Sequence, residues 1–366
     1  MKSTESASSE RIYYMDLARC VILLTGVFFH AAFVFSNPQW MVVSPWRSEI
    51  LDAFVQFVRG FRMETLFLVS GFFSAVLVTN RGSKGFFLNR MVRMGVPLVF
   101  CGLLFNGMAV MLQDKPIIPW RDAEYFISGT WMLHLWNMAN LMVYEAAIFS
   151  TLWLVPSLHR KLAEMRIRIP VALFLYLIAV VGLYWIWYRL PSFRGSEMLF
   201  QPIALATFAP AYLLGYTVHQ NKALREGLFD LRLSIPLAFG LFTLVHAVGH
   251  FLPQYAESRP LRMLINLEHI SWTLLLFSVV RRFETRHIWV RRIAISSYTI
   301  YILHLPLQIA LYRYLPAVRE GWGAFLFLSI VPIVVVWIFH VQVVERWGWA
   351  GFLFNGKIYN DKTRSF

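Results

Sequence analysis

Long apolar segments alternate with short polar ones along almost the whole chain. Each apolar segment is close to or longer than the ~20 residues with which an α-helix crosses a bilayer. Every connecting loop is short, and neither a fixed-period repeat nor a separate soluble domain is visible. The pattern predicts an all-α polytopic bundle of about ten membrane-spanning helices, near residues 16–36, 52–80, 95–113, 129–155, 169–188, 201–218, 234–252, 263–280, 293–315 and 321–344.

The polar ends of the chain lie outside this pattern. Residues 1–10 are polar throughout, so we expect a disordered N-terminus. Residues 11–345 are expected to form the membrane domain, and residues 346–366 a cytoplasmic tail. Residues 11–32 also have the basic start and apolar core of a signal peptide. The nine apolar segments that follow favour an uncleaved first helix instead.

Composition supports the membrane assignment. Hydrophobic residues make up 58% of the 366 positions and charged residues only 15%, whereas a soluble domain carries roughly 25% charged residues. An aromatic content of 17% fits interfacial belts and a large buried pocket. Cys20 and Cys101 both fall inside predicted spans, so we expect neither a structural disulfide nor a metal site built on cysteine.

The net charge of +14 is explained by orientation in the membrane. With the N-terminus inside, cytoplasmic segments carry most of the 34 Lys and Arg residues, as the positive-inside rule requires. Both termini are therefore expected in the cytoplasm, and no nucleic acid is expected as a partner. The residues on this side are Lys2, Arg11, Arg19, Arg81, Lys84, Arg90, Arg93, Arg160, Lys161, Arg166, Arg168, Lys222, Arg225, Arg232, Arg281, Arg282, Arg286, Arg291, Arg292, Arg346, Lys357, Lys362 and Arg364.

The first predicted helix carries three ionisable groups on one face. Arg19 and His30 are eleven residues apart, which is about 1100° of rotation and ~16 Å of rise on an α-helix. Asp16 precedes Arg19 by one turn. Arg19 and His30 could each sit at an interface, with Asp16 as partner of the arginine. Alternatively they mark a polar path in which His30 is a general base and Arg19 an anion or carbonyl anchor.

The second predicted helix and the segment after it carry further charges. Arg62 and Glu64 are two residues apart and cannot face one another on a helix, so at least one needs a partner from another span. Ser70-Gly71, in mid-span, favours close helix packing over a catalytic hydroxyl. Arg90 and Arg93 share a helix face and could clamp a phosphate, but the positive-inside bias explains them at least as well.

Two later spans carry polar groups that are costly in lipid. In the fourth, His134 and Asn137 are one turn apart and could bind a sugar or contact His30, while Glu145 lies deep in the span and needs protonation, a partner or water. In the ninth, one helix face forms a continuous polar stripe expected to line the same cavity as Arg19 and His30. The stripe consists of Ser297, Tyr301, His304 and Gln308.

These motifs, in this order, resemble the integral membrane acyltransferase-3 superfamily. The resemblance covers almost the whole chain and rests on several elements. They are an arginine and a histidine separated by ten residues (Arg19, His30), F-x-x-S-G (Phe67 to Gly71), R-x-x-R-x-x-x-P (Arg90, Arg93, Pro97), H-L-W (His134 to Trp136) and S-Y-x-I-Y-x-x-H-x-P (Ser297 to Pro306). One departure is Asn137 after H-L-W, where relatives usually carry an aromatic residue.

Shorter stretches resemble members of the superfamily that succinylate osmoregulated periplasmic glucans. These stretches are RIYYMD at 11–16, FRM at 61–63, SGFFS at 70–74 and FNGK at 354–357. The resemblance implies an O-succinyltransferase that uses cytoplasmic succinyl-CoA as co-substrate, without a permanently bound cofactor, and a periplasmic glucan as acceptor. Glucan synthesis or export proteins are further potential partners.

The resemblance also implies roles for the residues above. His30 would deprotonate the acceptor hydroxyl, directly or while forming an acyl intermediate. Arg19 would lie near the thioester or the pantetheine of coenzyme A, and Asp16 belongs with His30 and Arg19 to the expected catalytic set. Arg90 and Arg93 would bind the phosphates of the donor. Arg62 is the candidate, from its charge and depth, to neutralise the succinyl carboxylate. The expected substrate-binding set is Arg62, Glu64, His134, Ser297, Tyr301 and His304.

Two other functions remain open from the sequence. The same superfamily includes enzymes that O-acetylate other envelope polysaccharides from acetyl-CoA. A transporter could also use the arginines and histidines as an anion or proton pathway, although no inverted repeat or paired broken helices are visible. Incorporation of acyl label into a glucan distinguishes an enzyme from an exporter.

Overall fold

The computed structural model describes residues 13–37, 41–114, 118, 121, 123–189, 202–255, 258–283 and 288–357. Every regular element in these ranges is helical, which confirms the expected all-α fold. The α-helices are α1 (Tyr13–Val34), α2 (Glu49–Cys101), α3 (Gly107–Leu112), α4 (Ala123–Ile127), α5 (Trp136–Leu154), α6 (Leu158–Glu164), α7 (Ile169–Arg189), α8 (Pro202–Gln220), α9 (Lys222–Leu228), α10 (Leu231–Phe251), α11 (Arg259–Arg282), α12 (Ile288–Tyr314), α13 (Gly321–Phe339) and α14 (Gly348–Asn355).

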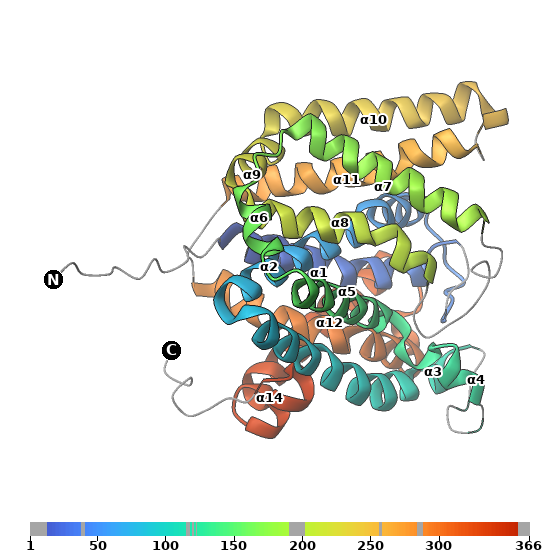
Figure 1. Cartoon of the computed structure of the whole chain (residues 1–366). Helices are drawn as coiled ribbons and strands as arrows, with labels where there is room; N and C mark the ends of the chain where they lie inside the picture. Colours follow the sequence, from blue (N-terminus) through green and yellow to red (C-terminus); the bar gives the residue numbers. More distant parts are fainter. Residues whose placement is uncertain are drawn as a thin grey trace.

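Short irregular helical segments interrupt or connect these elements. π-helical turns follow α2 and α13, at Gly102–Asn106 and His340–Val344, and 3₁₀ segments lie at Thr130–Leu135, Pro253–Tyr255 and Pro316–Val318. The long helices run side by side across the bundle (Figure 1). Within the described residues, six helices are long and apolar enough to cross a membrane, or seven if the bent pair 123–154 and 158–164 counts as one span. The chain is therefore a multi-pass membrane protein.

The helix α2 contains the predicted span 52–80 and the start of the predicted span 95–113, which continues through the π-helical turn into α3. It breaks at Gly82, whose positive φ of 68° is readily adopted only by glycine. The chain then folds back, so that the Arg90 guanidinium contacts residues 20 and 16 positions earlier: it donates to the Ser70 carbonyl at 3.0 Å and to the Ser74 hydroxyl at 2.9 Å. The segments predicted at 52–80 and 95–113 thus form a helical hairpin.

Two glycines let α2 and α8 pack backbone to backbone. A Cβ atom on Gly71 would lie 1.9 Å from the Tyr212 carbonyl oxygen, and a Cβ on Gly215 would lie 1.9 Å from the Leu68 carbonyl oxygen. Neither space admits a methyl group. The neighbouring Ser70 hydroxyl donates to the Leu66 carbonyl at 2.8 Å within its own helix. Ser70-Gly71 is a packing element, as its mid-span position predicts.

Glu145 finds its partners inside the bundle. Its side chain is fully buried on α5 and lies 3.2 Å from the Arg90 guanidinium. It also accepts hydrogen bonds from the Ser74 hydroxyl at 2.7 Å and the Tyr212 hydroxyl at 2.9 Å. This network joins both arms of α2 to α5 and α8. It satisfies a charge that would be costly alone in a low-dielectric interior.

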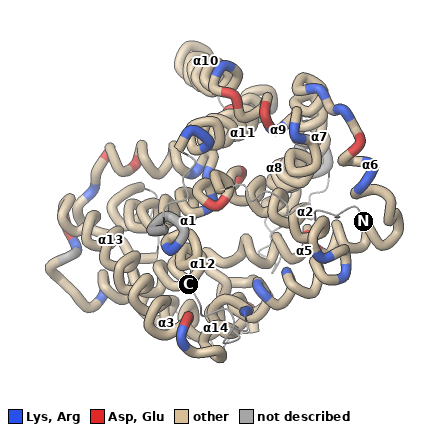
Figure 2. Tube along the Cα trace, turned by 90° about the vertical axis from the view of Figure 1, so that its left-hand side faces the viewer, with Lys and Arg blue, Asp and Glu red and all other residues tan. Residues whose placement is uncertain are grey.

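Both described ends of the chain lie at one end of the bundle, together with α6, α9 and α14 (Figure 1). Figure 2 is seen from this end, and the blue segments of Lys and Arg in it outnumber the red segments of Asp and Glu. We call it the basic end; it contains the beginning of α1 and Lys357. Within the expected tail, α14 is not separate from the bundle, because it packs on α2 and buries Ala350 and Phe354 in the main core. Residues 1–10 lie outside the described residues.

Candidate active site

One stripe of α1 lines a pocket near the middle of the bundle. Leu23, Gly26 and His30 follow Arg19 at four, seven and eleven residues, and all three border the pocket. The helix face predicted from the arginine–histidine spacing therefore lines this pocket from Leu23 to His30. Ile22 borders the same space, so the pocket extends for two helical turns from His30 toward Arg19.

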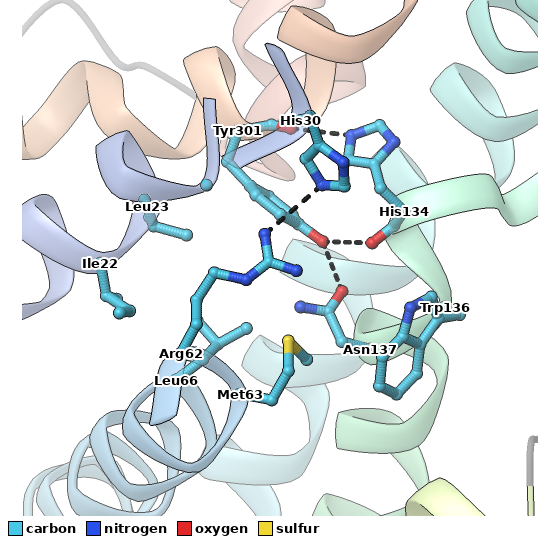
Figure 3. A pocket seen from close by; sticks show the side chains of 11 residues that line it. Ile22, Leu23, His30, Arg62, Met63, Leu66, His134, Trp136, Asn137 and Tyr301 are labelled. Atoms are coloured by element: carbon cyan, nitrogen blue, oxygen red, sulfur yellow. Dashed lines mark hydrogen bonds between the residues drawn. The ribbon is translucent and has the colours of Figure 1, made fainter. Parts of the chain in front are cut away.

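Three other segments complete the pocket. Its walls come from α2, from the Thr130–Leu135 segment with the start of α5, and from α12 (Figure 3). The cavity volume is about 40 Å³, which holds a few water molecules but not a sugar or an acyl group. Substrates therefore have to widen it. Besides the α1 residues, its lining comprises Arg62, Met63, Leu66, His134, Trp136, Asn137 and Tyr301.

Arg62 points at the candidate base. Its Nη1 lies 3.4 Å from Nε2 of His30, and its guanidinium carbon lies 4.0 Å from the centre of the Phe29 ring (Figure 3). Among the described residues it has no carboxylate partner, and its shielded Nε has no hydrogen-bond acceptor. A cation–π contact offsets only part of the cost of burying a guanidinium. The pocket thus holds a positive charge that no carboxylate of the described residues neutralises.

Three histidines meet beside this charge. The ring centres of His30 and His304 are 5.3 Å apart, those of His30 and His134 5.9 Å, and those of His134 and His304 4.9 Å. The cluster joins α1, the H-L-W segment and α12. His134 borders the pocket with His30, and the His304 ring lies against both, although sequence spacing alone could not bring three helices together. Of the predicted α12 stripe, Tyr301 borders the pocket, whereas Ser297, His304 and Gln308 are not among its lining residues.

Two of these rings are held by one carbonyl oxygen. His134 donates from Nε2 to the Tyr301 carbonyl at 2.9 Å, and His304 donates from Nδ1 to the same oxygen at 2.7 Å. Because a carbonyl only accepts, these nitrogens carry the hydrogens, and the other nitrogen of each neutral ring is an acceptor. Both remaining acceptors are buried without a partner in the described part of the chain. Each of these two nitrogens needs a hydrogen-bond donor, such as a hydroxyl group or a water molecule.

An unusual backbone presents His134. Leu133 has φ 45° and ψ −121°, a strained backbone conformation for any residue other than glycine. Asn106 holds the preceding turn by donating to the carbonyls of Trp131 at 3.2 Å and Met132 at 2.8 Å. The Tyr301 hydroxyl lies 2.7 Å from the His134 carbonyl oxygen and 2.5 Å from Oδ1 of Asn137. Asn137, the departure from the family pattern, therefore positions Tyr301.

Arg19 and Asp16 lie further along the α1 stripe. Arg19 pairs with Asp16 at 3.2 Å, donates to the Ala294 carbonyl at 3.5 Å and lies 5.2 Å from the centre of the Phe73 ring. The guanidinium side chain is 34% exposed. It borders the basic end and does not line the pocket. The two residues thus stand where a molecule approaching from the basic end would first meet the stripe.

Glu64 turns away from the pocket. Its carboxylate lies 3.4 Å from Nδ1 of His269 on α11. Gly60 makes room for that ring, since a Cβ there would lie 2.9 Å from it. Arg62 and Glu64 thus take partners on different helices, as their spacing requires. The structure places Glu64 at the α2–α11 contact and not among the residues that line the pocket, so its expected contact with substrate is not supported.

Of the remaining predicted residues, two lie on α2 and two on α12. Arg90 is committed to Glu145, whereas Arg93 lies toward the basic end, where its carbonyl accepts a hydrogen bond from Tyr298 at 2.9 Å. In the α12 stripe, Ser297 donates to the Ala294 carbonyl at 2.9 Å within its own helix. Gln308 donates to the carbonyls of Val27 at 2.8 Å and Leu328 at 3.0 Å, and so ties α12 to α1 and α13.

Sequence reasoning missed several residues of the site. Gly26 borders the pocket opposite Arg62, and a Cβ there would lie 3.3 Å from the Arg62 Nη1. Asn106 and Leu133 shape the turn before His134. Only Gly129, whose φ is 75°, offered a local signal, because a glycine before H-L-W is compatible with a sharp turn.

Comparison with known proteins gives one family. The acyltransferase domain model of the acyltransferase-3 family matches residues 12–341. The match includes every pocket residue described above. The resemblance found in the sequence motifs is therefore confirmed over nearly the whole chain. No solved structure matches this chain.

Curated relatives carry the name glucans biosynthesis protein C. The protein from Escherichia coli (strain K12) is 29% identical over 143 residues, which are 37% of this chain and 37% of the relative. The protein from Salmonella gallinarum is 25% identical over 225 residues, or 57% of this chain and 59% of the relative. The chain is thus aligned with less than two thirds of the length of these relatives.

Proposed function

The chain belongs to the acyltransferase-3 family, and from this premise we propose that it moves a succinyl group from cytoplasmic succinyl-CoA to hydroxyl groups of a periplasmic glucan. It is a membrane acyltransferase; the donor, the acceptor and the roles below are the proposed part. The basic end would face the cytoplasm of a bacterial inner membrane, in accord with its Lys and Arg residues.

His30 would act as general base. In the described chain it is the histidine next to Arg62 and between the α1 stripe and the other two rings, so both substrates would meet at it once the pocket widens. As the acceptor oxygen attacks the thioester carbon, its O–H bond breaks and His30 takes the proton. The new O–C bond forms, the C–S bond breaks, and the proton passes to the departing thiolate. Atoms and charges balance without a redox step or a resident cofactor.

The observation that carries the succinyl assignment is Arg62. A guanidinium in a small interior pocket, without a carboxylate partner in the described chain, needs an anion to lower its cost. A succinyl group brings a carboxylate to this position, and an acetyl group does not. Arg62 would also lie close enough to His30 to stabilise negative charge on the carbonyl oxygen during attack.

The acceptor assignment rests on the two other histidines. Buried ring acceptors on His134 and His304 favour a hydroxyl-rich molecule over an apolar one. Trp136 borders the same pocket and offers an apolar face of the kind that packs against sugar rings. The relatives named glucans biosynthesis protein C make a glucan the first acceptor to test.

Mass spectrometry of periplasmic glucans tests this function directly. Glucans from cells with the protein should carry a succinyl mass increment that is absent without the protein and absent with His30→Ala. A matched variant, His246→Ala, changes an exposed histidine on α10 and should keep the increment. Glucans that are unmodified in every strain would contradict the glucan assignment. An acetyl increment would replace the proposed donor, and export of unmodified glucan that depends on the protein would favour a transporter.

A further inference from the structure

The C-terminal end of α14 is fixed against α2 next to Arg93. Gly356 adopts φ 56°, and a Cβ there would lie 2.4 Å from both the Cα of Arg93 and the carbonyl oxygen of Val92. The helix closes with hydrogen bonds from Gly356 N to the Phe352 carbonyl at 2.8 Å and from Lys357 N to the Gly351 carbonyl at 3.1 Å. This closing geometry with a left-handed glycine holds the next residue in place. Lys357 is therefore set beside Arg93 by backbone contact.

A buried polar network anchors α14 from the other side. The Thr299 hydroxyl lies 2.7 Å from Nδ1 of His340 and 3.0 Å from Oδ1 of Asn355, the last residue of α14. Nε2 of His340 lies 3.3 Å from Glu345. The network connects α12, the π-helical turn after α13, and α14. The segment that carries Lys357 is thus a built part of the bundle.

Three cations from distant parts of the sequence converge here. Lys357 lies close enough to Arg93 on α2 and Arg19 on α1 for their charges to lower its pKa, while Glu345 acts in the opposite direction. Burial contributes most, and the pKa of Lys357 falls to about 8. Asp16 faces Arg19, and Arg292 acts on Glu345. The hydrogen bond from His340 lowers the pKa of Glu345, so that carboxylate stays ionised at neutral pH.

Holding like charges together at a partly buried position is unfavourable unless an anion joins them. Among the described groups that act on Lys357, Arg93 and Arg19 are cations and Glu345 is a carboxylate, so an anionic ligand would be stabilised at this place. The cluster also lies at the Arg19 end of the α1 stripe, which leads to His30. A thioester whose acyl group reaches His30 along this stripe would have its phosphate-bearing part at the basic end.

We propose that Lys357, with Arg93 and Arg19, binds the phosphate groups of the acyl-CoA donor. The C-terminal F-N-G-K segment would then be part of the donor site and not a tail. Arg90, which was expected beside Arg93, is replaced in this role by Lys357, because its guanidinium is committed to Glu145. This inference rests on the proposed acyl-CoA chemistry and names one binding residue for it.

The test measures binding of coenzyme A to the full chain in phosphatidylcholine nanodiscs by calorimetry. Charged hydrogen bonds of ~1.5–3 kcal/mol correspond to roughly tenfold or more in affinity. Lys357→Ala should therefore raise the dissociation constant of coenzyme A about tenfold or more, and Lys357→Arg should largely restore it. Lys84→Ala, an exposed lysine on α2, is the matched control and should change nothing. Binding of pantetheine, which lacks phosphates, should be equal in all four proteins.

Each contrary result has its own meaning. Unchanged coenzyme A binding in a folded Lys357→Ala variant would overturn the inference and leave the proposed function intact. If that variant instead loses the thermal stabilisation that wild type gains from phosphatidylglycerol, the cluster holds a lipid headgroup and the inference is wrong. Absence of coenzyme A binding in wild type would overturn the proposed function as well.

Discussion

At the scale of single residues, the pocket is defined by charges whose partners are not obvious from sequence. Arg62, Glu64 and Arg90 lie within thirty residues of one another on α2, yet they serve three different purposes. Glu64 pairs with His269, Arg90 pairs with Glu145, and Arg62 points at His30. Of these three, only Arg62 keeps its charge available to a ligand. A substitution at each position should therefore have a different signature.

Replacing Arg62 should change donor preference. Arg62→Gln removes the charge while keeping a polar side chain, and the loss of a buried charged contact is worth ~1.5–3 kcal/mol. We expect turnover with succinyl-CoA to fall at least about tenfold more than turnover with acetyl-CoA. The measurement is a competition between the two labelled donors. Equal losses of turnover with both donors would show that Arg62 does not bind the carboxylate of the succinyl group.

Donor binding should weaken as the pH rises through about 8. The pKa of Lys357 is lowered to about 8 in the free protein, mainly by burial. Above that pH its ammonium group loses a proton and with it the positive charge. A bound phosphate raises that pKa, so the dissociation constant of coenzyme A should increase by up to about tenfold per pH unit between the two values. Lys357→Arg should remove this dependence, because arginine stays charged.

Stability of the free protein should move in the opposite direction. An unfolded lysine titrates near ~10.4, above the folded pKa of about 8. Between these values the unfolded state binds more protons, so this group makes the folded protein more stable as pH rises. Weaker binding together with an unchanged or higher melting temperature would exclude alkaline unfolding. A fall in both the affinity for coenzyme A and the melting temperature would contradict the assignment to Lys357.

At the scale of elements, close helix packing positions the pocket. The α2–α8 contact depends on Gly71 and Gly215, where each missing side chain admits the backbone of the other helix. The break at Gly82 then returns α2 past its own first half, so that Arg90 meets Ser70 and Ser74. These contacts fix the depth of Arg62, which belongs to the same rigid arm.

Adding one methyl group at Gly71 should disrupt this arrangement. Overpacking of a filled site typically costs ~1–3 kcal/mol, and here the new carbon would meet a backbone oxygen at 1.9 Å. We expect Gly71→Ala to lower the melting temperature markedly and to reduce the yield of monodisperse protein. Gly240→Ala is the control, because no atom lies within 4 Å of a Cβ built at that position. Equal melting temperatures for the two variants would refute the packing role.

At the scale of the whole molecule, one end of the bundle collects both described chain ends and the short helices α6, α9 and α14, whereas α3 and α4 lie at the opposite end (Figure 1). The positive-inside rule predicts that this end faces the cytoplasm, and the proposed donor chemistry requires it there, since an anionic thioester does not cross a bilayer. The pocket lies deeper, where an acceptor from the opposite side can meet the acyl group. Orientation and chemistry are therefore linked.

Reporter fusions after Phe366 test this orientation. A green fluorescent protein fused to the C-terminus should be fluorescent, because it folds in the cytoplasm. An alkaline phosphatase at the same position should be inactive, because it needs the oxidising periplasm to form its disulfides. Active phosphatase without fluorescence would place the basic end outside and would exclude Lys357 from any cytoplasmic donor site.

The sequence by itself determined the features that depend on local pattern. Runs of apolar residues are long enough to satisfy their own backbone hydrogen bonds in lipid, so the all-α bundle follows from them. The helical period places Arg19 and His30 on one face regardless of what packs against it. Motif order was also sufficient to identify the family.

Only the tertiary structure decided which charges are used and which are free for a ligand. A periodic pattern shows that Glu64, Arg90 and Glu145 need partners, but the partner depends on which helices touch and at what depth. The turn at Leu133, the room left by Gly26 and the place of Lys357 beside Arg93 likewise arise from contacts between residues far apart in the chain. Such contacts are set by packing and charge between helices, which no single segment encodes.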